Sequence, residues 1–154
     1  MKNLMAALMM ILFLYSCHQN SEKKYSEVNM NTIEFYNYKG EKISKDDITA
    51  QWNNRLQKKE KLNLSVESIE ITYLKDESTS EEKIALIGNT NKSSTKTATE
   101  LIEHKKGLKL SDRVTTCSNC KNEGLNIVIK EGHLYCKSSE ENSDCTKIST
   151  LQYD

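Results

Sequence analysis

The stretch SKDDITAQWNNRLQKKEKLNLSVESIEITYL, residues 44–74, contains the pattern of a helix followed by the pattern of a strand. In its first half the apolar residues recur every four positions, which is the spacing of one helix face: Ile48, Trp52 and Leu56. Ser44 stands where a side chain caps a helix N-terminus, and Asp47 adds a negative charge that suits the helix dipole. We therefore predict a helix over about residues 45–60, with Trp52 as a core residue.

The second half of this stretch, and most of the chain after it, favours strands. Apolar and polar residues alternate from Val66 to Leu74, as in a strand with one buried face. Further strand-like segments are residues 31–38, 83–88, 108–110, 125–130 and 133–137, and Glu131-Gly132 joins the last two as a hairpin. We expect Lys75–Glu82 to form a solvated loop, and the polar residues 89–99 to lead into a threonine-rich edge strand ending near Ile102.

These elements predict an α+β fold in which one amphipathic helix packs on a small antiparallel β-sheet. The chain has 154 residues, of which 36% are hydrophobic, and neither a repeat nor a second domain is evident. We therefore predict a single domain over residues 30–154, with a disulfide-stapled C-terminal segment over residues 117–145.

Composition excludes several classes of protein. The 22 basic and 22 acidic residues balance, which argues against a nucleic-acid-binding protein, and the absence of proline excludes proline-rich ligands and collagen. No glycine-rich phosphate loop or catalytic arrangement of serine, histidine and carboxylate stands out. His104 and His133 are flanked by charged or turn residues, so we expect them to be exposed and without a role.

The N-terminus has the layout of a secretory signal peptide. Lys2 supplies a positive charge, and Leu4 to Tyr15 are twelve consecutive apolar residues, too few for an ordinary membrane-spanning helix. The last two residues of this run and the two residues after it form the sequence Leu14-Tyr15-Ser16-Cys17. It resembles the lipobox of bacterial lipoproteins, in which a leucine and two further residues precede a cysteine that is lipidated after cleavage.

The resemblance implies that residues 1–16 are removed as a signal peptide and that Cys17 becomes the lipidated first residue. Two or more acyl chains hold a protein stably on a bilayer. Residues 17–29 are polar and mixed in charge, and we expect them to form a flexible tether. His18 stands where an aspartate would retain a lipoprotein at the inner membrane, which favours the outer membrane. The alternative is an ordinary secreted protein that is cut near Ser16 and keeps Cys17 unmodified.

Four further cysteines, Cys117, Cys120, Cys136 and Cys145, follow the pattern C-x2-C-x15-C-x8-C. An even number of cysteines in a small secreted domain indicates disulfide bonds. Bridges between neighbours in the sequence would close short loops, worth roughly 1.9 and 2.7 kcal/mol. Bridges from the CxxC pair to the two later cysteines close longer loops, worth roughly 6.7 kcal/mol in all, and are therefore favoured. The two ways of making these longer bridges remain open.

A redox site and a zinc site are the two alternatives to structural disulfides for these cysteines. A thioredoxin-type redox site needs a helix after the CxxC motif, whereas here a turn and a strand are predicted. A zinc site of Cys117, Cys120, His133 and Cys136 has reasonable spacing. However, alternate faces of a strand would separate His133 from Cys136. We therefore expect disulfides, with neither a metal nor a cofactor.

The signal peptide and the C-terminal cysteines together resemble those of small cysteine-rich lipoproteins of Gram-negative bacteria. This resemblance implies a lipid-anchored protein of the cell envelope, most simply a non-enzymatic binding module. Its expected partners are the membrane, through the lipid on Cys17, and a protein of the envelope. The alternative is an inhibitor or chaperone-like module that acts on a secreted enzyme, similar to lipoproteins that inhibit lysozyme.

Overall fold

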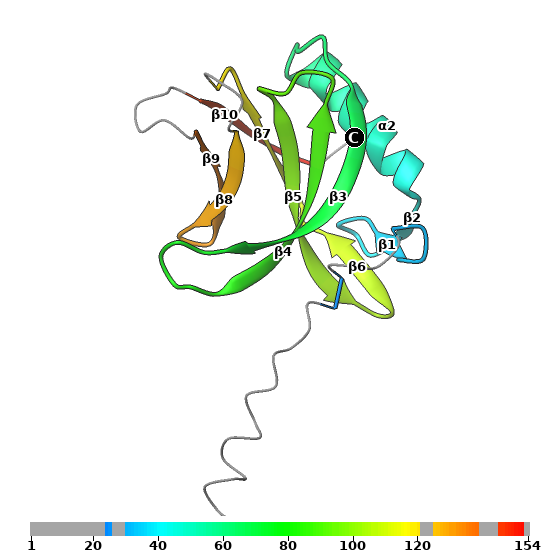
Figure 1. The fold of residues 1–154 in the computed structure, drawn as a ribbon. Coiled ribbons are helices and arrows are strands. Elements are labelled where there is room, and N and C mark those ends of the chain that lie inside the picture. Colours follow the sequence, from blue (N-terminus) through cyan, green and yellow to red (C-terminus); the bar gives the residue numbers. More distant parts are fainter. Residues whose placement is uncertain (1–23, 26–29, 121–124, 139–144, 153–154) are drawn as a thin grey trace, which may run out of the picture.

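The computed structural model describes residues 24–25, 30–120, 125–138 and 145–152, and Figure 1 shows its fold. Within these residues there are one α-helix, which continues into a π-helical turn, and ten strands. The helical elements are α2 (Lys45–Asn54) and η1 (Arg55–Lys59). The strands are β1 (Phe35–Tyr36), β2 (Lys42–Ile43), β3 (Val66–Lys75), β4 (Glu82–Thr90), β5 (Lys96–His104), β6 (Gly107–Leu110), β7 (Arg113–Ser118), β8 (Asn126–Lys130), β9 (His133–Lys137) and β10 (Thr146–Leu151).

Eight of these strands form one sheet around β5. Strand β5 pairs with β4 along one side, and along its other side it pairs first with β7 and then with β6. Strands β6 and β7 thus act as one long strand that is interrupted at Ser111 and Asp112. The sheet continues on both sides of this interruption. Strand β10 pairs with β7, whereas β1 pairs with β6 and β2 pairs with β1.

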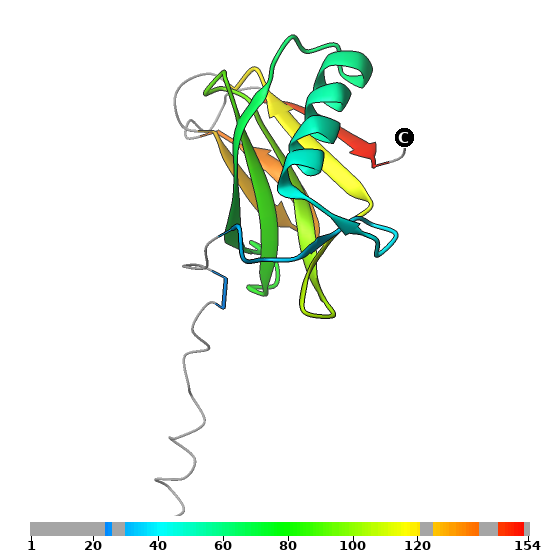
Figure 2. The ribbon, with the colours of Figure 1, turned by 90° about the vertical axis from the view of Figure 1, so that its right-hand side faces the viewer.

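The helix covers one face of this sheet, as Figure 2 shows from the side. Ile48, Trp52 and Leu56 are at most 2% exposed and pack with Leu86 and other sheet residues in one core cluster. Gly88 makes room for the indole, because a Cβ atom at this position would lie 2.8 Å from a ring carbon of Trp52. The predicted helix and the core position of Trp52 are therefore confirmed.

The N-terminus of α2 is capped as the sequence predicts. The Asp47 N–H donates to Ser44 Oγ over 3.1 Å, and the Ser44 N–H donates to the Asp47 carboxylate over 3.3 Å. Such reciprocal bonds satisfy two of the N–H groups that a helix leaves without partners in its first turn. The pKa of Asp47 is lowered by its hydrogen bonds with Ser44, so the carboxylate form of the cap is favoured.

The opposite face of the sheet is covered by the hairpin of β8 and β9, which forms a separate two-stranded sheet. A second core cluster lies between them and includes Ala85, Ile87 and Ile129. Successive residues of β4 therefore point into different cores, Leu86 toward the helix and its two neighbours toward the hairpin. Burial on both faces explains why the sequence of β4 is a short continuous apolar run.

The α+β prediction is confirmed only coarsely, because the protein is largely β. The predicted small antiparallel sheet is wrong in size, and the pairing of β1 with β6 is parallel. The prediction of a threonine-rich edge strand is also wrong, since β5 is paired on both sides. Residues 89–99 are not mainly a loop: β4 continues to Thr90 and β5 begins at Lys96. Strand β10 was not predicted.

Part of the predicted flexible tether is attached to the domain. Tyr25 is only 9% exposed, and its backbone N–H donates to the Tyr73 hydroxyl over 3.0 Å. Lys24 forms an ion pair with Glu103 at 3.1 Å. The predicted tether over residues 17–29 is therefore wrong at these two positions; the predicted signal peptide and Cys17 lie outside the described residues. No helix in the described part of the chain is long and apolar enough to cross a membrane.

Candidate functional site

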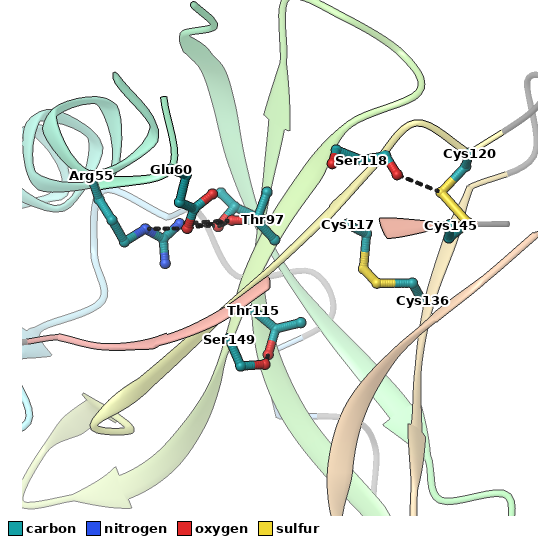
Figure 3. The surroundings of a disulfide bond; sticks show 11 residues. Arg55, Glu60, Thr97, Thr115, Cys117, Ser118, Cys120, Cys136, Cys145 and Ser149 are labelled. Carbon is teal, nitrogen blue, oxygen red and sulfur yellow. Dashed lines mark hydrogen bonds and ion pairs between the residues drawn. A yellow bond between two sulfur atoms is a disulfide. The ribbon is translucent and has the colours of Figure 1, made fainter. Parts of the chain in front are cut away.

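The C-terminal cysteines form two disulfide bonds, Cys117–Cys136 and Cys120–Cys145, which are drawn in Figure 3. The predicted disulfides are thus confirmed, and the pairing is one of the two long-loop alternatives. The sulfurs of the CxxC motif bond to different partners, whereas a thioredoxin-type site pairs them with each other. The Cys117–Cys136 bridge joins β7 to β9 and so fixes one end of the β8–β9 hairpin, whereas Cys120–Cys145 joins the segment after β7 to the residue before β10.

The zinc alternative is not what the structure shows. Three of its four proposed ligands are in disulfides, and His133 is exposed at the start of β9. Within the described residues there is no cluster of three or more side chains that could hold a metal ion. The expectation that His133 is exposed is confirmed. His104 was expected to be exposed too, but it is half-buried and packs edge-on against the Tyr36 ring.

The other end of the hairpin is held by Asp76, a residue that the sequence analysis placed in a solvated loop. Its carboxylate is 2% exposed and accepts hydrogen bonds of 2.7 Å from the backbone N–H groups of both Ser78 and Gly132. The Ser78 hydroxyl in turn accepts from the Glu131 N–H over 3.2 Å. These hydrogen bonds connect the loop between β3 and β4 to the turn between β8 and β9.

Asp76 could have been found from the sequence as the first residue of a turn. Aspartate commonly accepts hydrogen bonds from backbone groups two residues further on, and the sequence Asp76-Glu77-Ser78-Thr79 offers such groups. Its bond to Gly132 is distant in sequence and has no local signal. The pKa of Asp76 is lowered, chiefly by the hydrogen bond from the Ser78 N–H.

We expect Asp76→Asn to lower the melting temperature at neutral pH, because an amide cannot accept from Gly132 and from the β3–β4 turn equally well. A lowered pKa in the folded state means that Asp76 stabilises the fold above its unfolded pKa, near 4. This contribution is lost as the pH falls through the folded pKa. Melting curves between neutral pH and about pH 2 should therefore show less acid sensitivity in Asp76→Asn than in the wild type. Equal acid sensitivity of the two proteins would contradict this role.

An open groove lies between the hairpin and the main sheet. Its volume is about 640 Å³, within the range of ligand-binding clefts. It is lined by residues of four segments of the chain: Glu100, Ser111, Arg113, Thr115, Gly132, His133, Leu134, Tyr135, Lys147 and Ser149. Because the Cys117–Cys136 bridge holds one end of the hairpin and Asp76 the other, this groove is built into the fold.

The charges that line the groove are mainly positive. Glu100, the one carboxylate among its lining residues, is paired with Lys83 at 3.3 Å. Arg113 and Lys147 form no ion pair within the described residues. The Lys147 ammonium group lies 3.9 Å from the centre of the Tyr135 ring, and burial lowers the pKa of this lysine. Tyr135 itself is 46% exposed at the edge of the groove.

The lining of the groove combines hydroxyl groups, cations and an aromatic ring. The hydroxyls of Thr115 and Ser149 hydrogen-bond to each other over 3.0 Å, as Figure 3 shows. His133 forms no hydrogen bond with a hydroxyl in the described part of the chain. Two cations and an exposed aromatic ring in one groove can hold acidic and apolar groups of a partner.

A buried polar cluster on the helix side of the sheet was also missed by the sequence analysis. Arg55 lies 5% exposed at the start of η1, and its Nε is 3.3 Å from the carboxylate of Glu60. The guanidinium also donates to the Thr97 and Thr116 hydroxyls. Figure 3 shows this cluster between the helix and the sheet. Burial lowers the pKa of Arg55 to about 10, and Glu60 partly offsets this shift.

Comparisons with known proteins provide no relative for this chain. No family model matches it, and neither a curated protein nor a solved structure is significantly similar to it.

Proposed function

We propose that this chain is a lipid-anchored protein of the bacterial cell envelope, attached to the outer membrane through Cys17, and that it binds a partner without catalysing a reaction. The observation that carries the binding role is the preformed groove beside the β8–β9 hairpin, with its excess of positive charge. The lipid anchor is supported by the lipobox-like sequence at residues 14–17. The two disulfides suit the oxidising space outside the cytoplasm.

The groove indicates the chemical character of the partner. Arg113 and Lys147 favour carboxylates, and the exposed ring of Tyr135 offers an apolar surface beside them. Tyrosine and arginine are the residue types that most often contribute strongly to protein interfaces. An acidic segment of an envelope protein that carries an apolar side chain fits this groove best.

The anchoring part of the proposal is tested by Cys17→Ser in the full-length chain. Without the cysteine no lipid can be attached, so incorporation of labelled fatty acid should be abolished. Unchanged incorporation into Cys17→Ser would refute the lipid on this residue. A wild-type chain that carries no fatty acid would refute the anchor altogether.

The binding part is tested by capture of partners from an envelope extract with the wild-type protein and with Arg113→Ala/Tyr135→Ala. Side chains central to an interface often contribute 2 kcal/mol or more, so the double variant should retain less than about one tenth of the specific partner. Lys58→Ala/Lys92→Ala is the matched control, because both lysines are exposed and lie outside the groove. Equal capture by both variants would show that the groove is not the binding site. Capture of a secreted enzyme that loses activity would favour the inhibitor alternative.

A further inference from the structure

The distance between the lipid and the folded domain is limited by the chain itself. This inference rests on the proposed lipid at Cys17. Lys24 is seven residues further along, and seven residues span at most about 25 Å even when fully extended. Lys24 and Tyr25 are fixed to the domain by Glu103 and Tyr73. The end of the domain that holds these two residues must therefore stay near the bilayer.

The turn between β5 and β6 lies at this same end of the domain. In Figures 1 and 2 the short blue segment of Lys24 and Tyr25 lies near this turn, at the end opposite the β4–β5 connection. The ion pair of Lys24 with Glu103, near the end of β5, agrees with this position. Strand β1 also lies near this turn, because it pairs with β6, and β2 pairs with β1.

This end of the domain has an excess of positive charge. Two carboxylates at this end, Glu34 and Glu103, are each paired with a lysine, at 2.6 and 3.1 Å. A third carboxylate, Glu41, accepts a hydrogen bond from the Asn37 side chain. Three further lysines form no ion pair within the described residues: Lys105, Lys106 and Lys109. The Lys105 ammonium group lies 5.0 Å from the centre of the Tyr36 ring, which holds it beside the sheet.

An exposed apolar side chain lies among these lysines. Ile102 is 52% exposed, the highest value among the exposed large hydrophobic residues of the described structure. It is the cross-strand neighbour of Lys109. Toward the other end of β5, Ala98 belongs to the core beneath the hairpin, whereas Ile102 does not. We call Lys24, Ile102, Lys105, Lys106 and Lys109 the basal surface.

We propose that the basal surface docks on an anionic lipid bilayer, so that the anchored domain takes a defined orientation on the membrane. Lysines near an anionic membrane each contribute attraction corresponding to about a fivefold change in partition. An isoleucine at the same level can enter the interfacial region. The short connection to Cys17 keeps the basal surface within reach.

The test uses the full processed lipoprotein, reconstituted in vesicles of phosphatidylcholine with or without about one third phosphatidylglycerol. Lysines are labelled with a water-soluble amine reagent and quantified by peptide mass spectrometry. We expect labelling of Lys105, Lys106 and Lys109 to slow at least about fivefold on the anionic vesicles. Lys58 and Lys92, which are exposed and outside the basal surface, should be labelled equally on both. The difference should shrink at high salt because ions screen the attraction.

A charge variant makes the test specific. Lys105→Asn/Lys106→Gln removes two charges, and asparagine tolerates the positive φ of 51° at position 105. In this variant the labelling of Lys109 should return to its rate on neutral vesicles, whereas the control Lys58→Gln/Lys92→Gln should keep the slow rate. Equal labelling of the basal surface on both vesicles, or protection of another surface instead, would overturn the proposal. Fatty acid is measured in the same samples, so a chain without lipid refutes the proposed anchor, whereas a lipidated chain without protection refutes only the docking.

Discussion

Arg55→Ala is expected to lower the free energy of unfolding by about 3–5 kcal/mol, because it leaves the Glu60 carboxylate buried without its countercharge. The Glu60 side chain is only 1% exposed, so water cannot replace the guanidinium without rearrangement of the helix end. The variant also removes a donor from the Thr97 and Thr116 hydroxyls. Urea denaturation followed by the fluorescence of Trp52, the single tryptophan, measures this loss.

A double replacement separates the charge effect from the packing effect. Exchange of a buried ion pair for apolar residues of similar size is often neutral or even stabilising. Arg55→Met/Glu60→Leu should therefore recover most of the stability that Arg55→Ala loses. Lys58→Ala, an exposed change in the same π-helical turn, should stay within about 0.5 kcal/mol of the wild type. A loss below about 1 kcal/mol in Arg55→Ala would contradict the role of the pair.

The elements that could be predicted from the sequence are those with local signals. The helix has its cap at Ser44 and an apolar residue at every fourth position, and the β8–β9 hairpin has two strand patterns around Glu131-Gly132. Both elements lie within a few residues of their predicted positions. Local periodicity and turn chemistry were sufficient in these two cases, because the interactions that define each element join residues close in sequence.

The position of β5 could not be predicted, because it depends on long-range pairing. Its sequence is rich in threonine, which suggested an exposed edge. The structure instead buries Thr97 and Thr99, whose hydroxyls bond with Arg55 and with the Arg113 carbonyl group. The buried threonines hydrogen-bond with groups that are distant in sequence, so the sequence around β5 does not show that they are buried. The burial of Asp76 has the same cause, since its partner Gly132 is 56 residues away.

Of the candidate site, only the presence of the disulfide bonds could be predicted from the sequence. An even set of cysteines predicted disulfides, and loop entropy favoured bridges to the later cysteines, but it could not separate the two long-loop pairings. The choice between them depends on which sulfurs the hairpin brings next to β7. The groove could not be predicted either, because its lining comes from β5, β7, β9 and β10, and β10 itself was missed.

Removal of either disulfide is expected to destabilise the protein strongly. The two bridges join residues 19 and 25 positions apart. Loops of this length correspond to about 3 and 3.5 kcal/mol of lost chain entropy in the unfolded state. We expect Cys117→Ala/Cys136→Ala and Cys120→Ala/Cys145→Ala each to lower the free energy of unfolding by about that amount. Alanine is the appropriate replacement at position 117, because Cys117 is fully buried and a serine hydroxyl would need a partner there.

The two variants should affect the groove as well as stability, since Cys117–Cys136 holds one end of the hairpin and Cys120–Cys145 holds the start of β10, and both β9 and β10 line the groove. Asp76 still fixes the opposite end through Gly132, so the loss of one bridge should loosen the groove while the main sheet persists. Hydrogen exchange should then accelerate in β8 and β9 of Cys117→Ala/Cys136→Ala, and at the start of β10 in Cys120→Ala/Cys145→Ala, while β4 and β5 stay protected. Disulfide mapping of the wild type should find Cys117 joined to Cys136 and Cys120 joined to Cys145. Cys117 joined to Cys145 and Cys120 joined to Cys136 would contradict the structure. A loss of protection spread equally over the main sheet would show that the effect of the bridges is not local.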